Sequence, residues 1–195
     1  MVELHGNAPY KTVLIHGGPG AIDSLNSCAE ELNRLTGKGI VEALQSKYSI
    51  AELIEELHMQ ITEHCQDRLT LIGHSWGAWL AVLFAGKYPK ICKNIVLVGC
   101  PPLADQYVKE ISLRRLRSLS GEERKIFQRV IDKNIQSKLF LVQGVCDPHP
   151  IEGVMKPLKE NGIPCKTYIL EKCGHNPFME KYAKEEFYDI LQAII

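Results

Sequence analysis

The sequence has no excess of charge of either sign. Its 195 residues include 23 lysines and arginines and 23 aspartates and glutamates, so the formal net charge is zero. A chain without a net electrostatic field lacks the usual attraction for nucleic acid, anionic membrane surfaces and charged polymers. We therefore expect a small-molecule substrate and neither a nucleic-acid nor a membrane partner.

The sequence also lacks long apolar segments and paired cysteines. No apolar stretch reaches the roughly 20 residues of a membrane-spanning helix, and polar residues appear early at the N-terminus, unlike in a signal peptide. The seven cysteines are scattered, odd in number and without a C-x-x-C pair of metal-binding or redox type. These absences predict free thiols and a soluble, cytoplasmic protein.

The chain does contain apolar, β-branched runs separated by helical patterns. The runs are continuous rather than alternating, which indicates strands covered on both faces and therefore a mostly parallel sheet. They cover residues 12–15, 69–72, 95–98, 139–142 and 166–170, and the helical patterns cover residues 24–35, 49–64, 78–85, 154–160 and 181–193. Ser49 and Glu52 predict a capping box at the start of the second helix. Because the length suits one core, we expect a single α/β domain over residues 1–195, a mostly parallel sheet sandwiched by helices.

Residues 105–134 differ from the rest of the chain. They contain five arginines together with leucines and isoleucines at helical spacing, interrupted at Ser120-Gly121. This pattern predicts two short amphipathic helices that lie over the strand ends as a small lid. The alternative is a pair of solvated helices with no covering role.

The most informative stretch is Gly73-His74-Ser75-Trp76-Gly77, a serine between two glycines directly after the apolar run 69–72. A strand that turns sharply into a helix holds the residue at the turn in a strained conformation, and small flanking residues make room for it. The apolar segment after the turn is typical of a buried helix. The sequence therefore predicts a nucleophilic serine at position 75, whereas an ordinary serine in a glycine-rich turn is the alternative.

A serine hydroxyl needs a base within hydrogen-bond reach, and the base needs an acidic partner. Asp147 and His175 each follow a predicted strand, at the edge of a parallel sheet where sites collect. The order serine, aspartate, histidine is the one used on this type of sheet. We predict Ser75, His175 and Asp147 as catalytic residues, with Asp105 as the competing acid and His74 in a structural role.

The first strand ends in His16-Gly17-Gly18-Pro19-Gly20, which predicts an oxyanion hole. Two backbone N–H groups can stabilise the negative charge that develops on an attacked carbonyl oxygen. We assign these donors to Gly18 and Trp76, because Pro19 has no N–H. A phosphate-cradling loop is the alternative, but the segment has neither the lysine of a P-loop nor G-x-G-x-x-G spacing.

Together these motifs resemble the α/β-hydrolase fold superfamily, and the His-Gly-Gly-Pro-Gly form resembles the branch that contains proline iminopeptidases and related serine esterases. The resemblance implies a serine hydrolase that acts through an acyl-enzyme and needs no metal or organic cofactor. Esters of small or medium acyl groups are the expected substrates, since Trp76, Trp79, Leu103 and Phe178 would form an apolar pocket. Peptidase, lactonase, thioesterase and acyl-transfer activities stay open, as does a ligand receptor or interaction protein with little turnover.

The sequence departs from this family in its N-terminal half and in its lid. Only residues 2–6 precede the first predicted strand, so the usual opening hairpin should be missing or vestigial, and residues 39–42 are at best a short remnant. The strand at residues 12–15 would then lie near a sheet edge with unpaired backbone groups. We expect either Ile40 and Val41 or a second subunit, in a homodimer, to cover it. In the short lid, Glu110, Glu122 and Glu123 could replace the lid carboxylates of the iminopeptidases.

Overall fold

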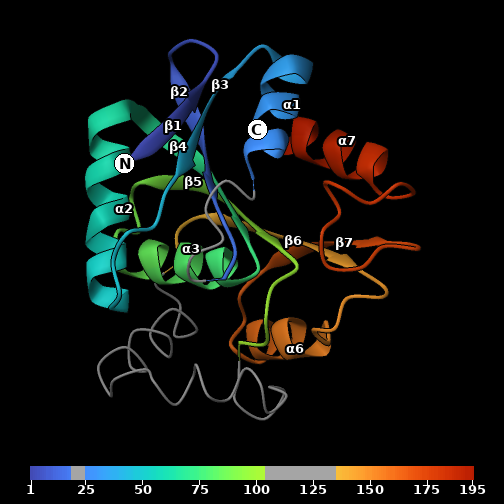
Figure 1. Ribbon diagram of the computed structural model, residues 1–195. Coiled ribbons are helices and arrows are strands. Elements are labelled where there is room, and N and C mark those ends of the chain that lie inside the picture. Colours follow the sequence, from blue (N-terminus) through green and yellow to red (C-terminus); the bar gives the residue numbers. More distant parts are fainter. Residues whose placement is uncertain (19–24, 104–134) are drawn as a thin grey trace.

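The computed structural model describes residues 1–18, 25–103 and 135–195, and in this part of the chain seven strands form one sheet (Figure 1). The strand order is β1-β3-β2-β4-β5-β6-β7. All neighbours are parallel except β1 and β3, which are antiparallel. The strands are β1 Val2–His5, β2 Tyr10–Ile15, β3 Gly39–Ala43, β4 Cys65–His74, β5 Cys92–Val98, β6 Lys138–Gly144 and β7 Cys165–Leu170.

Helices cover both faces of the sheet. Two of them lie on one face and three on the other, each over its own hydrophobic core (Figure 1). The first pair is α1 Asn26–Thr36 and α7 Lys184–Ile194; the second group is α2 Ile50–His64, α3 Trp76–Lys87 and α6 Glu152–Glu160. The predicted fold class, a mostly parallel sheet sandwiched by helices, is therefore confirmed.

The five predicted strands all form, and they extend the apolar runs by a few residues. The central strands show why the runs are continuous: residues 94–98 of β5 are all buried, because helices pack on both of its faces. The capping box at α2 is also present, since the Ser49 side chain accepts a bond from the Glu52 N–H and the Glu52 carboxylate accepts one from the Ser49 N–H. The predicted lid at 105–134 lies outside the described residues.

The N-terminal half is more complete than the sequence suggested. The segment expected to be a remnant forms β3, whose five residues are all buried between β1 and β2. Ile40 and Val41 pair with Thr12 and Val13 of β2, so β3 covers the strand that was expected near a sheet edge. β1 adds an antiparallel strand beyond β3 but does not pair with β2, so the first two strands do not form a hairpin with each other. In the described part of the chain, no helix combines the length and apolar character needed to cross a bilayer.

Candidate active site

Ser75 lies at the turn between β4 and α3, at the edge of the sheet where the parallel strands end. We call this the carboxyl edge. The φ angle of Ser75 is 54°, a left-handed conformation that a non-glycine residue rarely adopts. Its backbone N–H donates to the Val98 carbonyl at 2.8 Å, which ties the turn to the end of β5. The serine is partly exposed, so its hydroxyl can be reached from solvent.

The two glycines that flank this turn are required by contact with backbone. A Cβ atom on Gly73 would lie 2.2 Å from the Gly77 carbonyl oxygen, and one on Gly77 would lie 2.2 Å from the Ile15 carbonyl oxygen. Neither backbone can move away cheaply, because both belong to the central sheet and its buried helix. The G-x-S-x-G spacing therefore follows from the close packing of β4 and α3 against the end of β2.

His175 and Asp147 lie together at the same edge. The Nδ1 atom of His175 and the Oδ2 atom of Asp147 are 2.9 Å apart, although 28 residues separate them in the chain. The Asp147 side chain has no exposed surface, and its other oxygen accepts the His149 N–H at 2.8 Å. Both carboxylate oxygens are thus held, so the position of the imidazole against Asp147 is fixed. An Nδ1–H that donates to Asp147 leaves Nε2 as a proton acceptor.

Gly99 joins the histidine to the serine turn. This glycine follows Val98, which accepts the Ser75 N–H, and its φ is 54°. A Cβ atom on Gly99 would lie 3.0 Å from His175 Nδ1, so the imidazole packs directly against the end of β5. Within the described residues the Ser75 hydroxyl makes no hydrogen bond. Such bonds are often long in ligand-free enzymes and shorten when substrate binds.

His74 packs against the segment that contains His175, in keeping with the structural role expected for it. It is buried, and its Nε2 lies 2.8 Å from the His175 carbonyl oxygen. Its ring also meets the Phe178 ring edge to face, with the centroids 5.1 Å apart. Burial lowers the pKa of His74 to about 4, so the ring is neutral and can donate Nε2–H to that carbonyl.

Glu180 holds the backbone on both sides of His175, and sequence reasoning missed it. Its two carboxylate oxygens accept the Gly174 N–H at 2.6 Å and the Asn176 N–H at 3.0 Å. Two bonds to a carboxylate fix a loop more firmly than neutral bonds would. The signal in the sequence was faint: a glutamate five residues after a candidate base, with no motif to mark it.

The two predicted oxyanion donors belong to segments that meet near Ser75: Gly18 follows Gly17, where a Cβ atom would lie 3.1 Å from the Ser75 Cβ, and Trp76 follows Ser75 in the chain. Gly18 has a φ of 39° and has open space where a side chain would be. Trp76 is the first residue of α3, so its backbone N–H has no partner inside the helix. Pro19 and Gly20 lie outside the described residues.

Gln45, which the sequence analysis also missed, links the two donor segments. Its side-chain amide donates to the His16 carbonyl at 2.9 Å, and its amide oxygen accepts the Trp76 indole N–H at 2.9 Å. Its backbone N–H donates to the His16 ring. The loop after β2 is thereby held at a fixed position relative to the start of α3.

The residues predicted to line an apolar pocket are divided between the two cores. Trp79 and Leu103 belong to the core between the sheet and α2, α3 and α6, whereas Phe178 belongs to the core on the opposite face. All three are buried, and the Trp79 indole donates to the Pro101 carbonyl. A pocket that these residues line together stays a prediction.

Two groups of side chains bring together atoms that could bind a metal ion. Asp147, His149 and His175 form one group, and Glu3, His5 and Glu42 form the other; in each the donor atoms lie within 4.8 Å of one another. In the first group the bond between Asp147 and His175 already uses one donor atom of each. In the second, Glu42 accepts the Leu25 N–H and Glu3 accepts the Asn26 side chain, so both carboxylates bind the start of α1.

Comparison with known proteins identifies the family of the fold. Residues 13–121, more than half of the chain, match a family described as the alpha/beta hydrolase fold. The chain therefore belongs to the α/β hydrolase fold family. A solved structure, the monoacylglycerol lipase of Paleococcus ferrophilus, superposes with a TM-score of 0.76 over 100% of this chain and 97% of its own, at 16% identity.

Two curated relatives resemble the chain in sequence. An abhydrolase domain-containing protein of Caenorhabditis elegans, abhd-5.2, is 26% identical over 70% of this chain. A proline iminopeptidase of Clostridioides difficile is 30% identical over 58% of this chain. The matches span 32% and 42% of these two relatives, so the chain covers less than half the length of either.

Proposed function

We propose that the protein is a serine hydrolase in which Ser75 is the nucleophile, His175 the general base and Asp147 the residue that orients the base. One observation carries the proposal: a buried carboxylate lies 2.9 Å from the Nδ1 of a histidine beside a serine held at a φ of 54°. Strain of this kind concentrates at functional sites. Membership of the α/β hydrolase fold family supports the same reading.

The reaction proceeds by acyl transfer to water. His175 Nε2 takes the proton of the Ser75 hydroxyl as the serine oxygen attacks the carbonyl carbon of the substrate. Asp147 stabilises the imidazolium that forms, and the N–H groups of Gly18 and Trp76 bind the oxygen as it becomes negative. The imidazolium then protonates the leaving group as its bond to the acyl carbon breaks. In the second half, His175 takes a proton from a water molecule whose oxygen attacks the acyl carbon, and it returns that proton to the Ser75 oxygen as the acid is released.

Esters of small or medium uncharged acyl groups are the proposed substrates. The residue after Ser75, Trp76, is aromatic and packs edge to face against Trp79, and Gly17 approaches the serine closely. A monoacylglycerol lipase with the same fold favours an ester. The similarity to a proline iminopeptidase makes an aminoacyl amide the second class to test. All seven cysteines are free thiols, which supports a reducing, cytoplasmic location.

A fluorophosphonate probe, which reacts with activated serines, tests the proposal. Wild-type protein should be labelled, Ser75→Ala should not, and His175→Ala should label much more slowly. Ser27→Ala is the matched control, because Ser27 is exposed on α1, and it should label like the wild type. Turnover of p-nitrophenyl esters of graded chain length and of aminoacyl amides then identifies the substrate class. Folded wild-type protein that resists the probe would instead favour a ligand receptor.

A further inference from the structure

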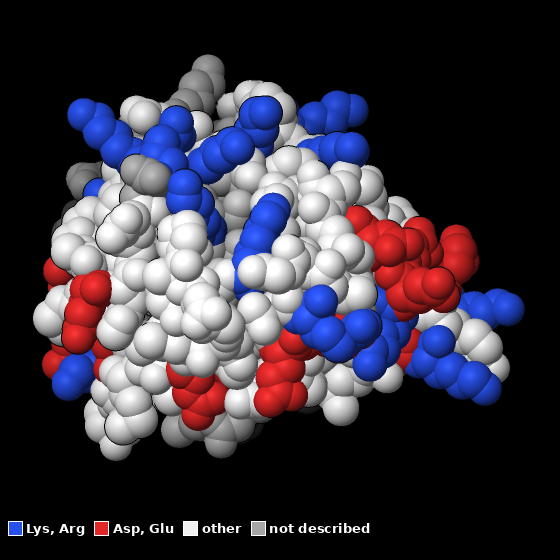
Figure 2. Space-filling view, turned by 90° about the horizontal axis from the view of Figure 1, so that it is seen from above, with Lys and Arg blue, Asp and Glu red and all other residues white. Residues whose placement is uncertain are grey.

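The opposite edge of the sheet, where β2, β4 and β5 begin, contains a basic cavity. We call this the amino edge. The cavity has a volume of about 430 Å³ and is lined by four basic side chains, Lys11, Lys38, Arg68 and Lys93. Figure 2 views this edge, and basic side chains gather there around a hollow. The concentration is local, because the chain as a whole has no net charge.

The four basic residues come from separate segments. Lys11 is in β2, Lys38 precedes β3, Arg68 is in β4 and Lys93 is in β5, so the fold rather than a run of basic sequence assembles them. All four are exposed, and no aspartate or glutamate is among the described residues that line the cavity. Like charges around one hollow repel one another, and a bound anion relieves that repulsion.

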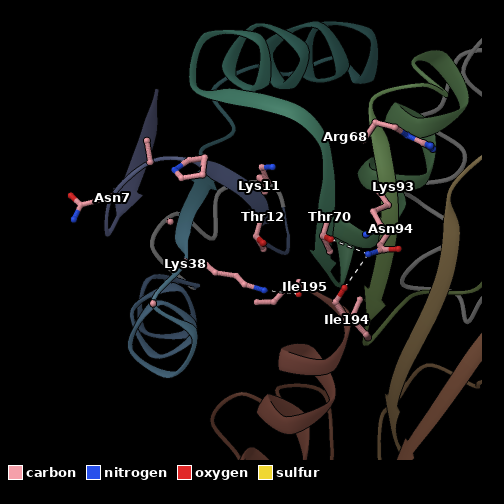
Figure 3. A pocket seen from close by; sticks show the side chains of 14 residues that line it. Asn7, Lys11, Thr12, Lys38, Arg68, Thr70, Lys93, Asn94, Ile194 and Ile195 are labelled. Carbon is pink, nitrogen blue, oxygen red and sulfur yellow. Dashed lines mark hydrogen bonds between the residues drawn. The ribbon is translucent and has the colours of Figure 1, made fainter.

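The floor of the cavity is polar, although it is part of the sheet. Thr12, Thr70 and Asn94 occupy paired positions on three neighbouring parallel strands and are all at least nine-tenths buried. The Asn94 amide donates to the Thr70 hydroxyl at 3.1 Å and to the Ile194 carbonyl at 3.0 Å, which fastens the end of α7 (Figure 3). Thr70 and Asn94 thus have a structural role as well.

Thr12 is different from its two neighbours in this row. It is 2% exposed, and its hydroxyl has no hydrogen-bond partner among the residues that the structure describes. The hydroxyl oxygen is not one of the fully enclosed polar atoms that lack a partner, so it retains some contact with solvent. Because Thr12 lines the cavity, its hydroxyl is available to a ligand there.

Lys38 and Arg68 are partly engaged with the protein. Lys38 donates to the Ile195 main-chain oxygen at 2.7 Å (Figure 3). Arg68 donates one N–H to the Cys92 carbonyl at 3.2 Å. An ammonium group has three N–H donors and a guanidinium has five. Both side chains therefore keep donors for an anion after these contacts are made.

We propose that this cavity binds a small organic phosphate monoester. Guanidinium and ammonium groups are the usual partners of phosphate in proteins, and a hydroxyl such as that of Thr12 adds a neutral donor. The volume is within the 300 to 1,000 Å³ or so typical of small-molecule sites and exceeds what a phosphate group alone would fill. The cavity therefore holds the organic part of the ligand as well. This site is separate from Ser75 and does not depend on the proposed hydrolase activity.

Isothermal titration calorimetry at low salt tests the proposal, with AMP, glycerol phosphate, inorganic phosphate and adenosine as probes. At least one of the two esters should bind, more tightly than inorganic phosphate, and adenosine should not bind. Lys93→Gln should weaken ester binding about tenfold, and Thr12→Val, which keeps the side-chain shape, should weaken it severalfold. The control Lys159→Gln removes the same charge from α6 and should leave the affinity unchanged.

Three results would overturn the proposal. The first is that neither ester binds at millimolar concentration to protein that a thermal melt shows to be folded. The second is equal weakening by Lys159→Gln and Lys93→Gln, which would mean diffuse attraction rather than a site. The third is inorganic phosphate binding as tightly as both esters, which would show that the cavity does not recognise an organic part.

Discussion

The two edges of the sheet hold their polar groups in opposite ways. At the carboxyl edge, Asp147 and His74 are buried and bonded to specific neighbours, so each group has one position. At the amino edge, Lys93 and the other three basic side chains are exposed around the cavity. This site is therefore defined by its positive charge rather than by close packing. The first arrangement suits chemistry that needs fixed geometry, whereas the second suits capture of a charged ligand.

Asp147→Asn should give the largest effect among the variants that sharpen this comparison. The amide would hold the His175 ring in the wrong tautomer, so kcat should fall by up to roughly 10⁴-fold. Steady-state turnover of the best ester substrate measures this loss, and chemical unfolding should show little change in stability. Binding of the phosphate monoester at the amino edge should be unaffected, because the two sites lie at opposite edges of the sheet.

Asp105→Asn is the matched variant, because Asp105 is the competing candidate for the acidic partner of His175. If it abolished turnover while Asp147→Asn were nearly silent, Asp147 would not be the acid, even though it lies against His175. The carboxyl edge would then need a different acidic partner.

Residues at the carboxyl edge were predictable where the signal was local. Gly73, Ser75 and Gly77 lie within five residues, and one turn of backbone explains all three. Asp147 and His175 were predictable because each directly follows a strand whose apolar run is visible. Glu180 and Gln45 were missed, because their roles depend on contacts between segments that no short pattern records.

The strand β3 was underestimated for a similar reason. Glu42 interrupts its apolar run, and a charged residue normally argues against a fully buried strand. In the fold, Glu42 is completely buried and its carboxylate accepts the Leu25 N–H at the start of α1. That tertiary contact, which the sequence does not reveal, gives the buried side chain a hydrogen-bond partner.

Gly77→Ala should be the most destabilising substitution at the carboxyl edge. The new methyl group would lie 2.2 Å from the Ile15 carbonyl oxygen, so β2 and α3 would have to separate. We expect a loss of about 3 kcal/mol or more in the free energy of unfolding, measured by urea denaturation. The control is Gly37→Ala, which has a φ of 67° but open space around it. It should cost only about 1 kcal/mol, and equal losses would contradict the packing argument.

Acidification should destabilise the carboxyl edge through His74. Burial lowers its folded pKa to about 4 from 6.5, although the bond to the His175 carbonyl acts in the other direction. Between these values the unfolded chain binds a proton that the folded chain does not. Stability is therefore lost as the pH falls through about 6.5, and the loss is complete below about 4. The total is about 3 kcal/mol.

Urea unfolding across this pH range, for wild type and His74→Gln, measures the effect. The glutamine amide can still donate to the His175 carbonyl but does not titrate, so the stability of the variant should depend less on pH over this interval. Parallel curves for the two proteins would assign the acid sensitivity to other groups.

Glu180→Gln should have the smallest effect, because it changes how firmly the His175 loop is held rather than a reacting group. The glutamine oxygen can accept only one of the two N–H groups that the carboxylate now accepts, and the amide NH₂ would face the other. We expect kcat to fall by about 10- to 100-fold, as for other groups that orient a functional side chain, with KM little changed. Glu171→Gln is the control, since Glu171 is exposed and near the same loop. A merely structural role for Glu180 would lower the melting temperature and leave kcat intact, whereas a positioning role lowers kcat and the rate of fluorophosphonate labelling together in folded protein.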